Sequence, residues 1–535
     1  MEFLYYFDDV FTLWAFGMLL LGTVFGLILG ATPGLSPTMA VALAIPFTFK
    51  MEPAHGLILL GALYTSTVAG GAVSAILLKI PGAPANIATT LDGHTMARNG
   101  DGKRALQLSF LASLFGGVAG VLLLIFATPI LAKWALVFGP SESFWIAILG
   151  VTVIGTLGSN SVIKGLLAGC IGLWISTIGF DDILGTQRFI FHSSLAGGIN
   201  IIPALIGLFA IPQVISMFAK GRAREDFEVL SIKPHPLRKA ITQVSRRTRA
   251  LGIGTSVGAI IGLIPGVGGQ IAGLVAYDQT RNFSPEREKF GTGHSEGIIA
   301  AESANNAMVG PSLVPLLTLS IPGSPTAAVL LGGLIIHGIF PGPNIFRDYP
   351  EVVWPFINSM LIGQILMCVF GLMIAGLAAN VARVPRAVMA AVVLALAVFG
   401  SYSVQLSMDD VFVMLVLGTG MYFLERYGYS AAPLVLGLIL GPIAEGNFVE
   451  GAMIAAASAM VVVMVPVILI FVGQPPIGAS AVAAMPADAP SATRIRAQAF
   501  RDIGFLSVSI AFALVLFAQV GFIVHLITFL DSVIG

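Results

Sequence analysis

Four short segments of the chain pair proline with glycine and then continue with small, hydroxyl or amide side chains. They are PGLSPT at 33–38, PGAPAN at 81–86, PGVGGQ at 265–270 and PGSPT at 322–326. Because proline removes a backbone donor and glycine accepts unusual backbone angles, we expect each segment to break an apolar helix. A helix that restarts after such a break presents free N–H groups and a partial positive charge, which suit a bound anion.

The segment HSEGIIAAESANNAMVG, residues 294–310, forms a second polar cluster. It places four polar residues at the start of an otherwise apolar helix: Glu302, Ser303, Asn305 and Asn306. Their amides and hydroxyls can bind a carboxylate or coordinate a cation. A glutamate buried in a membrane is costly unless it is paired or protonated, which would make Glu302 functional. At the membrane surface it would only cap or anchor the helix, and the sequence leaves both alternatives open.

The elements that must position these residues are membrane-spanning helices. Of 535 residues, 56% are hydrophobic and 10% are charged, whereas a soluble domain carries about a quarter charged residues. Nearly uncharged runs approach or exceed the roughly 20 residues that cross a bilayer, at 105–131, 143–163, 199–218, 356–379, 387–400, 411–424, 451–473 and 503–530. We therefore predict an all-α, polytopic membrane protein. The first apolar run follows Asp8 and Asp9 instead of a basic segment, so we interpret it as a mature helix and not a signal peptide.

Signals for an enzyme or a metal site are absent from the sequence. The histidines form no HExxH pattern, PGVGG lacks the GK[ST] ending of a phosphate-binding loop, and GTGHSEG at 291–297 lacks the spacing of a nucleophile elbow. Cys170 and Cys368 lie within apolar runs and are interpreted as packing residues. We expect no catalytic residue, no metal site and no cofactor, and the balanced charge (27 basic and 27 acidic residues) implies no attraction to nucleic acid.

The two halves of the chain repeat. The segment GTVFGLILGATPG begins at Gly22 and GTSVGAIIGLIPG begins at Gly254, so the same glycine and Pro-Gly spacing recurs after 232 residues. Residues 76–91 and 317–332 form a second matched pair, displaced by 241 residues. Glycines at every fourth position are typical of closely packed membrane helices. We predict that the glycines serve packing and that the residues after each break serve binding.

A basic polar stretch, residues 220–249, separates the halves. It holds nine Lys or Arg and three acidic residues, which favours a cytoplasmic position. If the basic segments 98–104 and 281–289 share that side, then 13–49 and 250–280 are re-entrant-like hairpins and the first half crosses the membrane an odd number of times. An odd number inverts the second half, as in many secondary transporters. The predicted organisation is therefore a first repeat at 1–219, the linker, a second inverted repeat at 250–474, and a linker plus one extra helix at 475–535.

Several stretches together resemble the large membrane subunit of the tripartite tricarboxylate transporters. They are the glycine ladder at 22–34, ILLKIPG to LDGHTMAR at 76–98, IGLIPGVGGQIAGLVAY at 261–277, EGIIAAESANNA at 296–307, the IPGSPT region at 316–343, GSYSV at 400–404 and APLVLGLILGP at 432–442. The resemblance implies a permease of the bacterial inner membrane. It also implies a small four-helix membrane subunit, a periplasmic solute-binding protein, and uptake of organic acids driven by an ion gradient and not by ATP.

We therefore predict a secondary active transporter that holds a small carboxylate between the four breaks. The predicted substrate-binding residues are Gly34, Ser36, Thr38, Gly82, Asn86, Gly266, Gly268, Gly269, Gln270, Gly323, Ser324, Thr326, Asn305 and Asn306. The predicted residues for a coupling cation, Na⁺ or a proton, are Glu302, Ser303 and Asn305. A passive anion channel and a membrane-embedded enzyme acting on lipid are the alternatives.

Lys79 directly precedes the break at 81–86 and is the one basic residue so placed among the four segments. Its side chain could face an anionic substrate or extend to the lipid head groups. The second alternative is favoured because the matching residue of the second half is Ser320.

Overall fold

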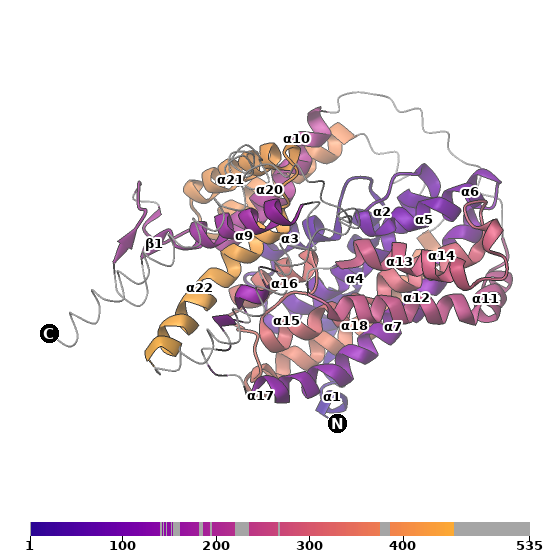
Figure 1. The fold of residues 1–535 in the computed structure, drawn as a ribbon, viewed down its shortest axis with the longest axis horizontal. Coiled ribbons are helices and arrows are strands. Elements are labelled where there is room, and N and C mark those ends of the chain that lie inside the picture. Colours follow the sequence, from indigo (N-terminus) through magenta and orange to yellow (C-terminus); the bar gives the residue numbers. More distant parts are fainter. Residues whose placement is uncertain are drawn as a thin grey trace, which may run out of the picture.

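The chain folds into a bundle of helices, seen in a computed structural model (Figure 1). The structure describes residues 2–137, 161–180, 186–192, 195–219, 235–265, 268–374 and 386–453, with isolated residues between 139 and 152. Within these ranges, seven helices are long and apolar enough to cross a membrane: α2 (Leu13–Ala31), α4 (Pro53–Leu78), α7 (Gly102–Ala135), α10 (Ile201–Ala219), α18 (Pro350–Ile374), α20 (Arg386–Gln405) and α22 (Ala431–Met453). The expectation of a polytopic helical protein is confirmed.

Shorter elements complete the described part of the chain. The helices of intermediate length are α3 (Pro37–Thr48), α9 (Val162–Ser176), α11 (Leu237–Arg246), α12 (Thr248–Leu263), α13 (Gly268–Phe283), α14 (Ser295–Ala307), α16 (Pro325–Ile336) and α21 (Met408–Arg426). The shortest are α1 (Glu2–Tyr5), η1 (Asp8–Phe11), η2 (Pro84–Asn86), α5 (Ile87–Thr89), η3 (Thr90–His94), α6 (Thr95–Arg98), η5 (Arg287–Lys289), η6 (Pro311–Leu313), α15 (Val314–Leu319) and α17 (Ile345–Asp348). Two-residue strands, β1 (Gly179–Phe180) and β2 (Gln187–Arg188), pair antiparallel with Gly179 opposite Arg188.

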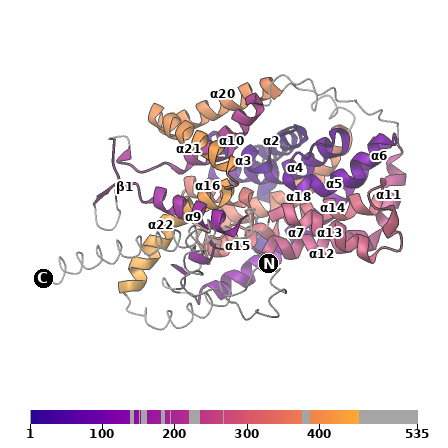
Figure 2. The same ribbon diagram turned by 45° about the horizontal axis from the view of Figure 1, so that its top comes forward.

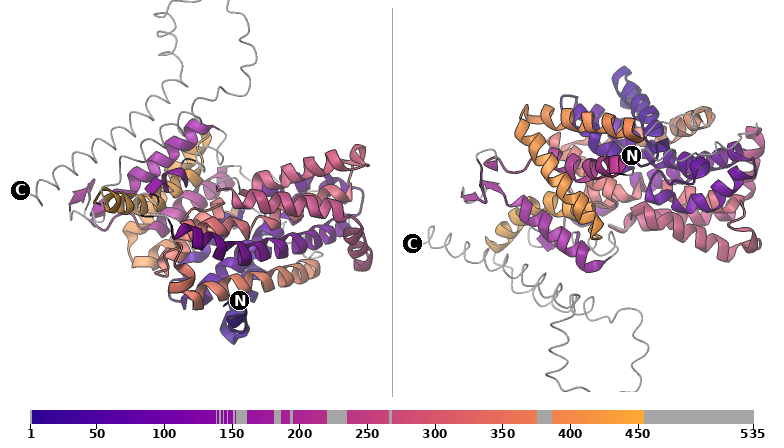
Figure 3. Two further views of the ribbon diagram at one scale, coloured as in Figure 1. Left: turned by 60° about the horizontal axis from the view of Figure 1, so that its bottom comes forward. Right: turned by 90° about the horizontal axis from the view of Figure 1, so that it is seen from above.

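The helices gather into two groups that are joined by α3 and α16. Helices α2, α4, α7, α11–α14 and α18 pack together at one side, and α9, α10 and α20–α22 at the other (Figures 1 and 2). Helix α3 contacts α4 and α16 as well as α10 and α20, so it lies between the groups. Helices from the first half, α4 and α7, run beside α12–α14 from the second half in both views of Figure 3. The halves are therefore interleaved and not separate bundles.

Two glycine ladders allow close packing of α2 on α4 and of α12 on α14. Gly22 and Gly26 of α2 face α4, where a Cβ atom would lie 2.6 Å from the Leu59 carbonyl oxygen and 2.9 Å from that of Leu63. Gly258 of α12 faces α14 in the same way, 2.7 Å from the Cα of Ala304. Backbones that approach this closely leave no room for a side chain, so the packing role predicted for the ladders is confirmed.

The described parts of the three basic segments that were predicted to share one side, 98–104, 235–249 and 281–289, lie at the same end of the molecule, near the labels α6 and α11 in Figure 1. The guanidinium of Arg104 donates to Gln243 Oε1 at 2.9 Å, which joins α7 to α11. Arg247 donates to Glu286 at 2.8 Å and to Glu296 at 2.7 Å, which joins the start of α12 to the 281–296 region. Residues 220–234 of the basic linker lie outside the described residues, as does the whole of 475–535.

Helix α22 differs from the expected pattern of apolar runs. The described helix begins at Ala431 and extends to Met453, so it starts well before the apolar run predicted at 451–473, and only the first three residues of that run are described. Pro442 and Glu445 lie inside this helix and interrupt its apolar sequence, so the helix is not an uninterrupted apolar run. The residues from 454 onward lie outside the described part of the chain.

Replacing Gly258 with Ala should destabilise the protein, because the added methyl group would overlap the backbone of Ala304. We expect a lower thermal unfolding midpoint in detergent, corresponding to a loss of roughly 1–3 kcal/mol. Gly252→Ala, on the same helix, is the matched control: a Cβ there has nothing within 4 Å, and alanine favours the helix. Equal midpoints for the two variants would contradict the packing role of the ladder.

Candidate functional site

The first predicted break separates α2 from α3. Helix α2 ends at Ala31, Gly34 adopts a positive φ of 90°, and α3 begins at Pro37. The hydroxyl of Ser36 accepts the N–H of Met39 at 3.2 Å and so caps the new helix. The break is therefore real, and a helix N-terminus begins two residues after the Pro-Gly pair.

The break at 322–326 has the same form. Helix α15 ends with Ser320 in the left-handed region (φ 59°), and α16 begins at Pro325. Ser324 caps α16 by accepting the N–H of Ala327 at 3.1 Å, and the N–H of Gly323 donates to the carbonyl of Ser312 at 3.0 Å. Two N-termini, of α3 and α16, are thus built by a Ser-Pro pair after a Pro-Gly pair.

The break at 81–86 restarts differently. Lys79 ends α4 in the left-handed region (φ 59°), but the next residues form a 3-10 turn, η2, a three-residue helix, α5, and a π-helical turn, η3. Asn86 therefore lies on a wound but irregular segment and not on a regular α-helix, and its side chain makes no capping bond. Lys79 itself is exposed, which fits either of the two positions considered for its side chain.

The fourth break is described only at its edges. Helix α12 ends at Leu263 and α13 begins at Gly268, so the helix is interrupted where the sequence predicted. Gly266 lies outside the described residues. Gly268, Gly269 and Gln270 are the first residues of α13.

The breaks lie against one another. The hydroxyls of Thr38 and Thr326 are hydrogen-bonded at 3.0 Å, which joins the N-termini of α3 and α16 across the two halves. A Cβ at Gly82 would lie 2.6 Å from the carbonyl oxygen of Gly30, at the end of α2. A Cβ at Gly323 would lie 2.8 Å from that of Gly262, at the end of α12. The structure thus brings the 33–38, 81–86 and 322–326 segments into one region, beside the end of α12.

Tyr64 holds the 322–326 break in place, although it is not among the site residues predicted from the sequence. Its hydroxyl is hydrogen-bonded to Ser324 at 2.9 Å and to Ser312 at 3.2 Å, and the side chain is buried. Ser324 therefore serves both the cap of α16 and a contact with α4 of the first half. A lone tyrosine in the apolar run GALYTSTVAGG was the available signal, since a buried phenol needs a partner for its O–H group.

Glu302 is fully buried, which excludes the role of a surface cap or anchor and leaves its function as a proposal. Its carboxylate accepts hydrogen bonds from Asn86 Nδ2 and Ser113 Oγ, both at 3.3 Å, and from the hydroxyl of Thr89. Asn306 Nδ2 donates to Ser113 Oγ at 2.7 Å and extends the same network. Glu302 is therefore neither a cap nor a surface anchor, and it joins α14 to η2, α5 and α7.

The position of Glu302 along α14 differs from the expectation that it begins a helix. Helix α14 begins at Ser295, a full two turns earlier. The carboxylate of Asp92 accepts the N–H groups of Gly291, Gly293 and His294 at 2.7–2.9 Å and so fixes the segment directly before the helix. This contact between distant parts of the chain was not visible in the local sequence.

The predicted polar residues of α14 separate into two groups. Asn305 and Asn306 are buried, and neither amide atom of Asn305 has a hydrogen-bond partner among the described residues. The oxygens of Asn86 and Asn306 also lack a partner there. Ser303 instead donates to the carbonyl of Ala300 at 3.2 Å and lies against Gly254 of α12, away from Glu302.

A group of three potential metal ligands lies at the basic end, on Glu286, His294 and Glu296. Both carboxylates accept hydrogen bonds from Arg247, which supplies the positive charge between them. Hydrogen bonds from Lys289 and Arg247 also lower the pKa of Glu286 to about 2. Since the carboxylates are already paired, we interpret the group as an ion-pair network that fixes this end of the molecule.

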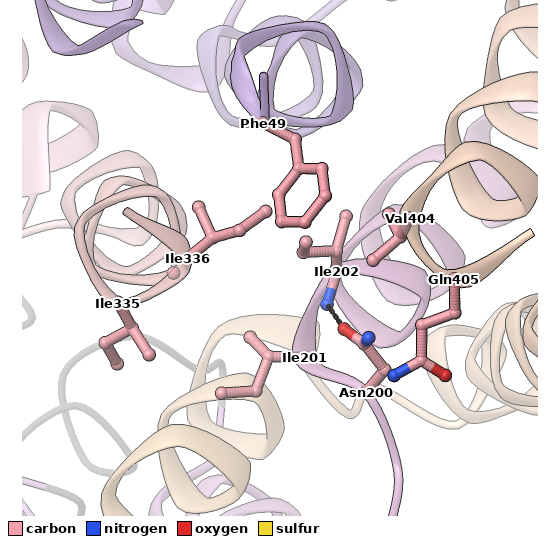
Figure 4. Close-up of a pocket in the computed structure, with 9 residues that line it drawn as sticks. Phe49, Asn200, Ile201, Ile202, Ile335, Ile336, Val404 and Gln405 are labelled. Carbon is pink, nitrogen blue, oxygen red and sulfur yellow. Dashed lines mark hydrogen bonds between the residues drawn. The ribbon is translucent and has the colours of Figure 1, made fainter. Parts of the chain in front are cut away.

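A cavity of about 270 Å³ lies at the C-terminal ends of α3 and α16, away from the breaks at their N-termini. Figure 4 shows its lining, in which Phe49, Ile201 and Ile336 converge and Asn200 is turned to the N–H of Ile202. The lining is largely apolar and offers no basic side chain. An anion would gain little there, so the breaks remain the better candidate for anion binding.

Comparisons with known proteins agree with the geometry. The family described as "Tripartite tricarboxylate transporter TctA family" matches residues 16–436. An uncharacterized 52.8 kDa protein in the TAR-I ttuC' 3' region of Agrobacterium vitis is 36% identical over 455 residues, covering 85% of this chain and 89% of that protein. An uncharacterized protein in the TAR-II ttuC' 3' region of the same organism is 36% identical over 210 residues, 39% of this chain and 87% of its own. No solved structure matches the chain.

Replacing Tyr64 with Phe should loosen the 322–326 break, since it removes one hydroxyl that contacts two serines and leaves the ring in place. We expect a loss of roughly 1–2 kcal/mol, measured as a lower thermal unfolding midpoint of the purified chain. Tyr5→Phe is the matched control, because Tyr5 is 82% exposed. A Tyr64→Phe midpoint equal to that of the control would show that the hydroxyl does not hold the break.

Proposed function

Because the chain belongs to the TctA family, the large membrane component of the tripartite tricarboxylate transporters, we propose that it is the permease of a secondary active transporter. It imports a small organic anion, a tricarboxylate or another carboxylate, with energy from an ion gradient. The observation that carries this proposal is the meeting of broken helices, in which Thr38 and Thr326 join two capped N-termini.

The chemistry of these N-termini supports a carboxylate substrate. Each helix begins at a proline, which has no N–H group, and the cap accepts the N–H of the third residue, so the N–H groups of Thr38 and Thr326 are the ones left for a ligand. The dipoles of both helices favour negative charge at this point. The hydroxyls of Thr38 and Thr326 now bond each other and would turn to the substrate oxygens. Asn86 and the glycines of the breaks complete the proposed site, because glycine allows a ligand to approach the backbone closely.

An inverted repeat is the organisation that we propose for these elements. Lys79 and Ser320, which occupy matched positions, end their helices with the same left-handed geometry, φ 59° in each. Gly82 contacts the end of α2 as Gly323 contacts the end of α12. The 12 residues of α3 or of α16 span about 18 Å and cannot cross roughly 30 Å of hydrocarbon, which supports re-entrant hairpins. The repeats would be 1–219 and 250–474, joined by the 220–249 linker.

The proposed setting is the bacterial inner membrane, with the basic end in the cytoplasm. The bonds of Arg104 and Arg247 gather the basic segments at one end, and such segments favour the cytoplasmic side. The apolar cavity at the C-terminal ends of α3 and α16 would then face the periplasm, where a solute-binding protein delivers the substrate. A small four-helix membrane subunit completes the proposed complex, and the permease itself performs no chemical conversion.

Uptake of radiolabelled carboxylates into vesicles tests the proposal. The vesicles would contain the permease, its small subunit and its binding protein, with and without an imposed Na⁺ or proton gradient. We expect the solute to become concentrated only when a gradient is present. Equilibration to the outside concentration under every condition would identify a passive anion channel and overturn the proposal.

Thr326→Val should reduce uptake about tenfold, since it removes a hydroxyl that would bind a charged ligand and keeps the shape of the side chain. Thr128→Val is the matched control, because the Thr128 hydroxyl is buried but bonds only the Leu124 carbonyl of its own helix. The measurement is the initial uptake rate at a low substrate concentration. Equal rates for the two variants would remove Thr326 from the substrate site.

A further inference from the structure

We propose that Glu302 and the amides around it form a binding site for one Na⁺ ion, shared by both halves of the chain. The site itself is argued from the contacts of Glu302, Asn86, Asn305 and Asn306. Its role as the coupling site rests on the transport function proposed above.

The negative charge of Glu302 is not balanced by any described positive side chain. The carboxylate is fully buried, and its hydrogen-bond partners Asn86, Thr89 and Ser113 are all neutral. None of the ion pairs among the described residues includes it. Burying an ionised carboxylate without a counter-charge costs several kcal/mol. The carboxylate of Glu302 therefore needs a positive partner, and the described residues do not supply one.

Buried amide oxygens on the residues around Glu302 accept no hydrogen bond from the described residues. Asn86 turns its NH₂ group to Glu302, and Asn306 turns its NH₂ group to Ser113 and to the Glu302 carbonyl, so that neither amide oxygen has a partner among the described residues. Asn305 is 1% exposed, and the described part of the chain supplies no partner for either of its amide atoms. Carboxylate and amide oxygens are ligands for hard cations. A proton on Glu302 would neutralise the charge and could be donated to one amide oxygen at most, whereas a cation can be bound by several oxygens at once, so the three amide oxygens favour an ion.

These residues approach one another from one face of α14 and from a segment of the first half of the chain. Glu302, Asn305 and Asn306 follow the i, i+3, i+4 spacing that places side chains on one face of a helix. Asn86 and Thr89 approach Glu302 from the segment that follows the 81–82 Pro-Gly pair, in the first half of the chain. An ion held here would draw η2 and α5 to α14, directly beside a break proposed to bind substrate. Ion binding would thus order the substrate site.

The sequence predicts that the site occurs once per chain. With the 241-residue displacement of the matched pairs, Gly61 corresponds to Glu302 and Tyr64 to Asn305. Gly61 lies against the ring of Phe356, and the hydroxyl of Tyr64 is satisfied by Ser312 and Ser324. The equivalent position in the first half therefore offers neither a charge nor a free oxygen.

Binding of radioactive Na⁺ to the purified full-length chain in detergent tests the proposal, with choline as the replacement cation. We expect saturable binding of one ion per chain and a higher thermal unfolding midpoint in Na⁺ than in choline. Glu302→Gln should weaken binding by roughly tenfold or more and abolish the Na⁺-dependent stabilisation. Asn305→Ala keeps the carboxylate and should also weaken Na⁺ binding. It replaces Glu302→Gln as the test variant if Glu302→Gln does not fold.

Ser303→Ala is the matched control, since its hydroxyl is on the same helix but bonds Ala300 and faces α12. It should bind Na⁺ as the unchanged protein does. Absence of Na⁺-dependent binding in the unchanged protein, or equal binding by Glu302→Gln and Ser303→Ala, would overturn the site. Na⁺ binding that survives while no gradient drives carboxylate uptake would instead overturn the proposed transport function and leave the ion site standing.

Discussion

Hydrocarbon cannot hydrogen-bond a free backbone group, and this constraint governs the whole arrangement of the chain. Each break frees N–H and carbonyl groups, so each must be buried in protein or line a water-filled cavity. The glycines of α2 and α12 make this possible, because they let α4 and α14 pack at backbone distance around the breaks. Ser36 and Ser324 then cap the restarted helices, and Tyr64 fixes Ser324 from the opposite half. Packing glycines and binding residues are thus parts of one solution.

The interleaving of the halves follows from the same requirement. Helix α7 of the first half packs on α14 of the second half, and α18 of the second half packs on α4 of the first. The consequence for function is that every interaction proposed for a ligand joins two halves: Thr38 with Thr326, and Asn86 with Glu302. A substrate or ion that strengthens these contacts would shift the equilibrium between conformations, which is what coupling requires.

Much of this could be predicted from the sequence, and the limits have physical causes. Proline and glycine act through their own backbone restrictions, so the breaks near Gly34 and Gly323 were visible as local patterns. The burial of Glu302, its partners Thr89 and Ser113, and the role of Tyr64 depend on residues about 190 to 260 positions away. The start of α14 was misplaced because Asp92, also distant, caps the preceding segment. Ser303 was grouped with Glu302 by adjacency, although neighbouring residues of a helix face different directions.

The central claim is that the meeting point of the broken helices binds the anion. Cryo-electron microscopy of the complete chain with a citrate-like carboxylate in Na⁺ would test it most directly. The account predicts ligand density within hydrogen-bond distance of Thr38 and Thr326, with the Thr38–Thr326 bond replaced by bonds to the ligand. Density that instead occupies the apolar cavity beside Ile201 and Ile336, with the two threonines still joined, would contradict it.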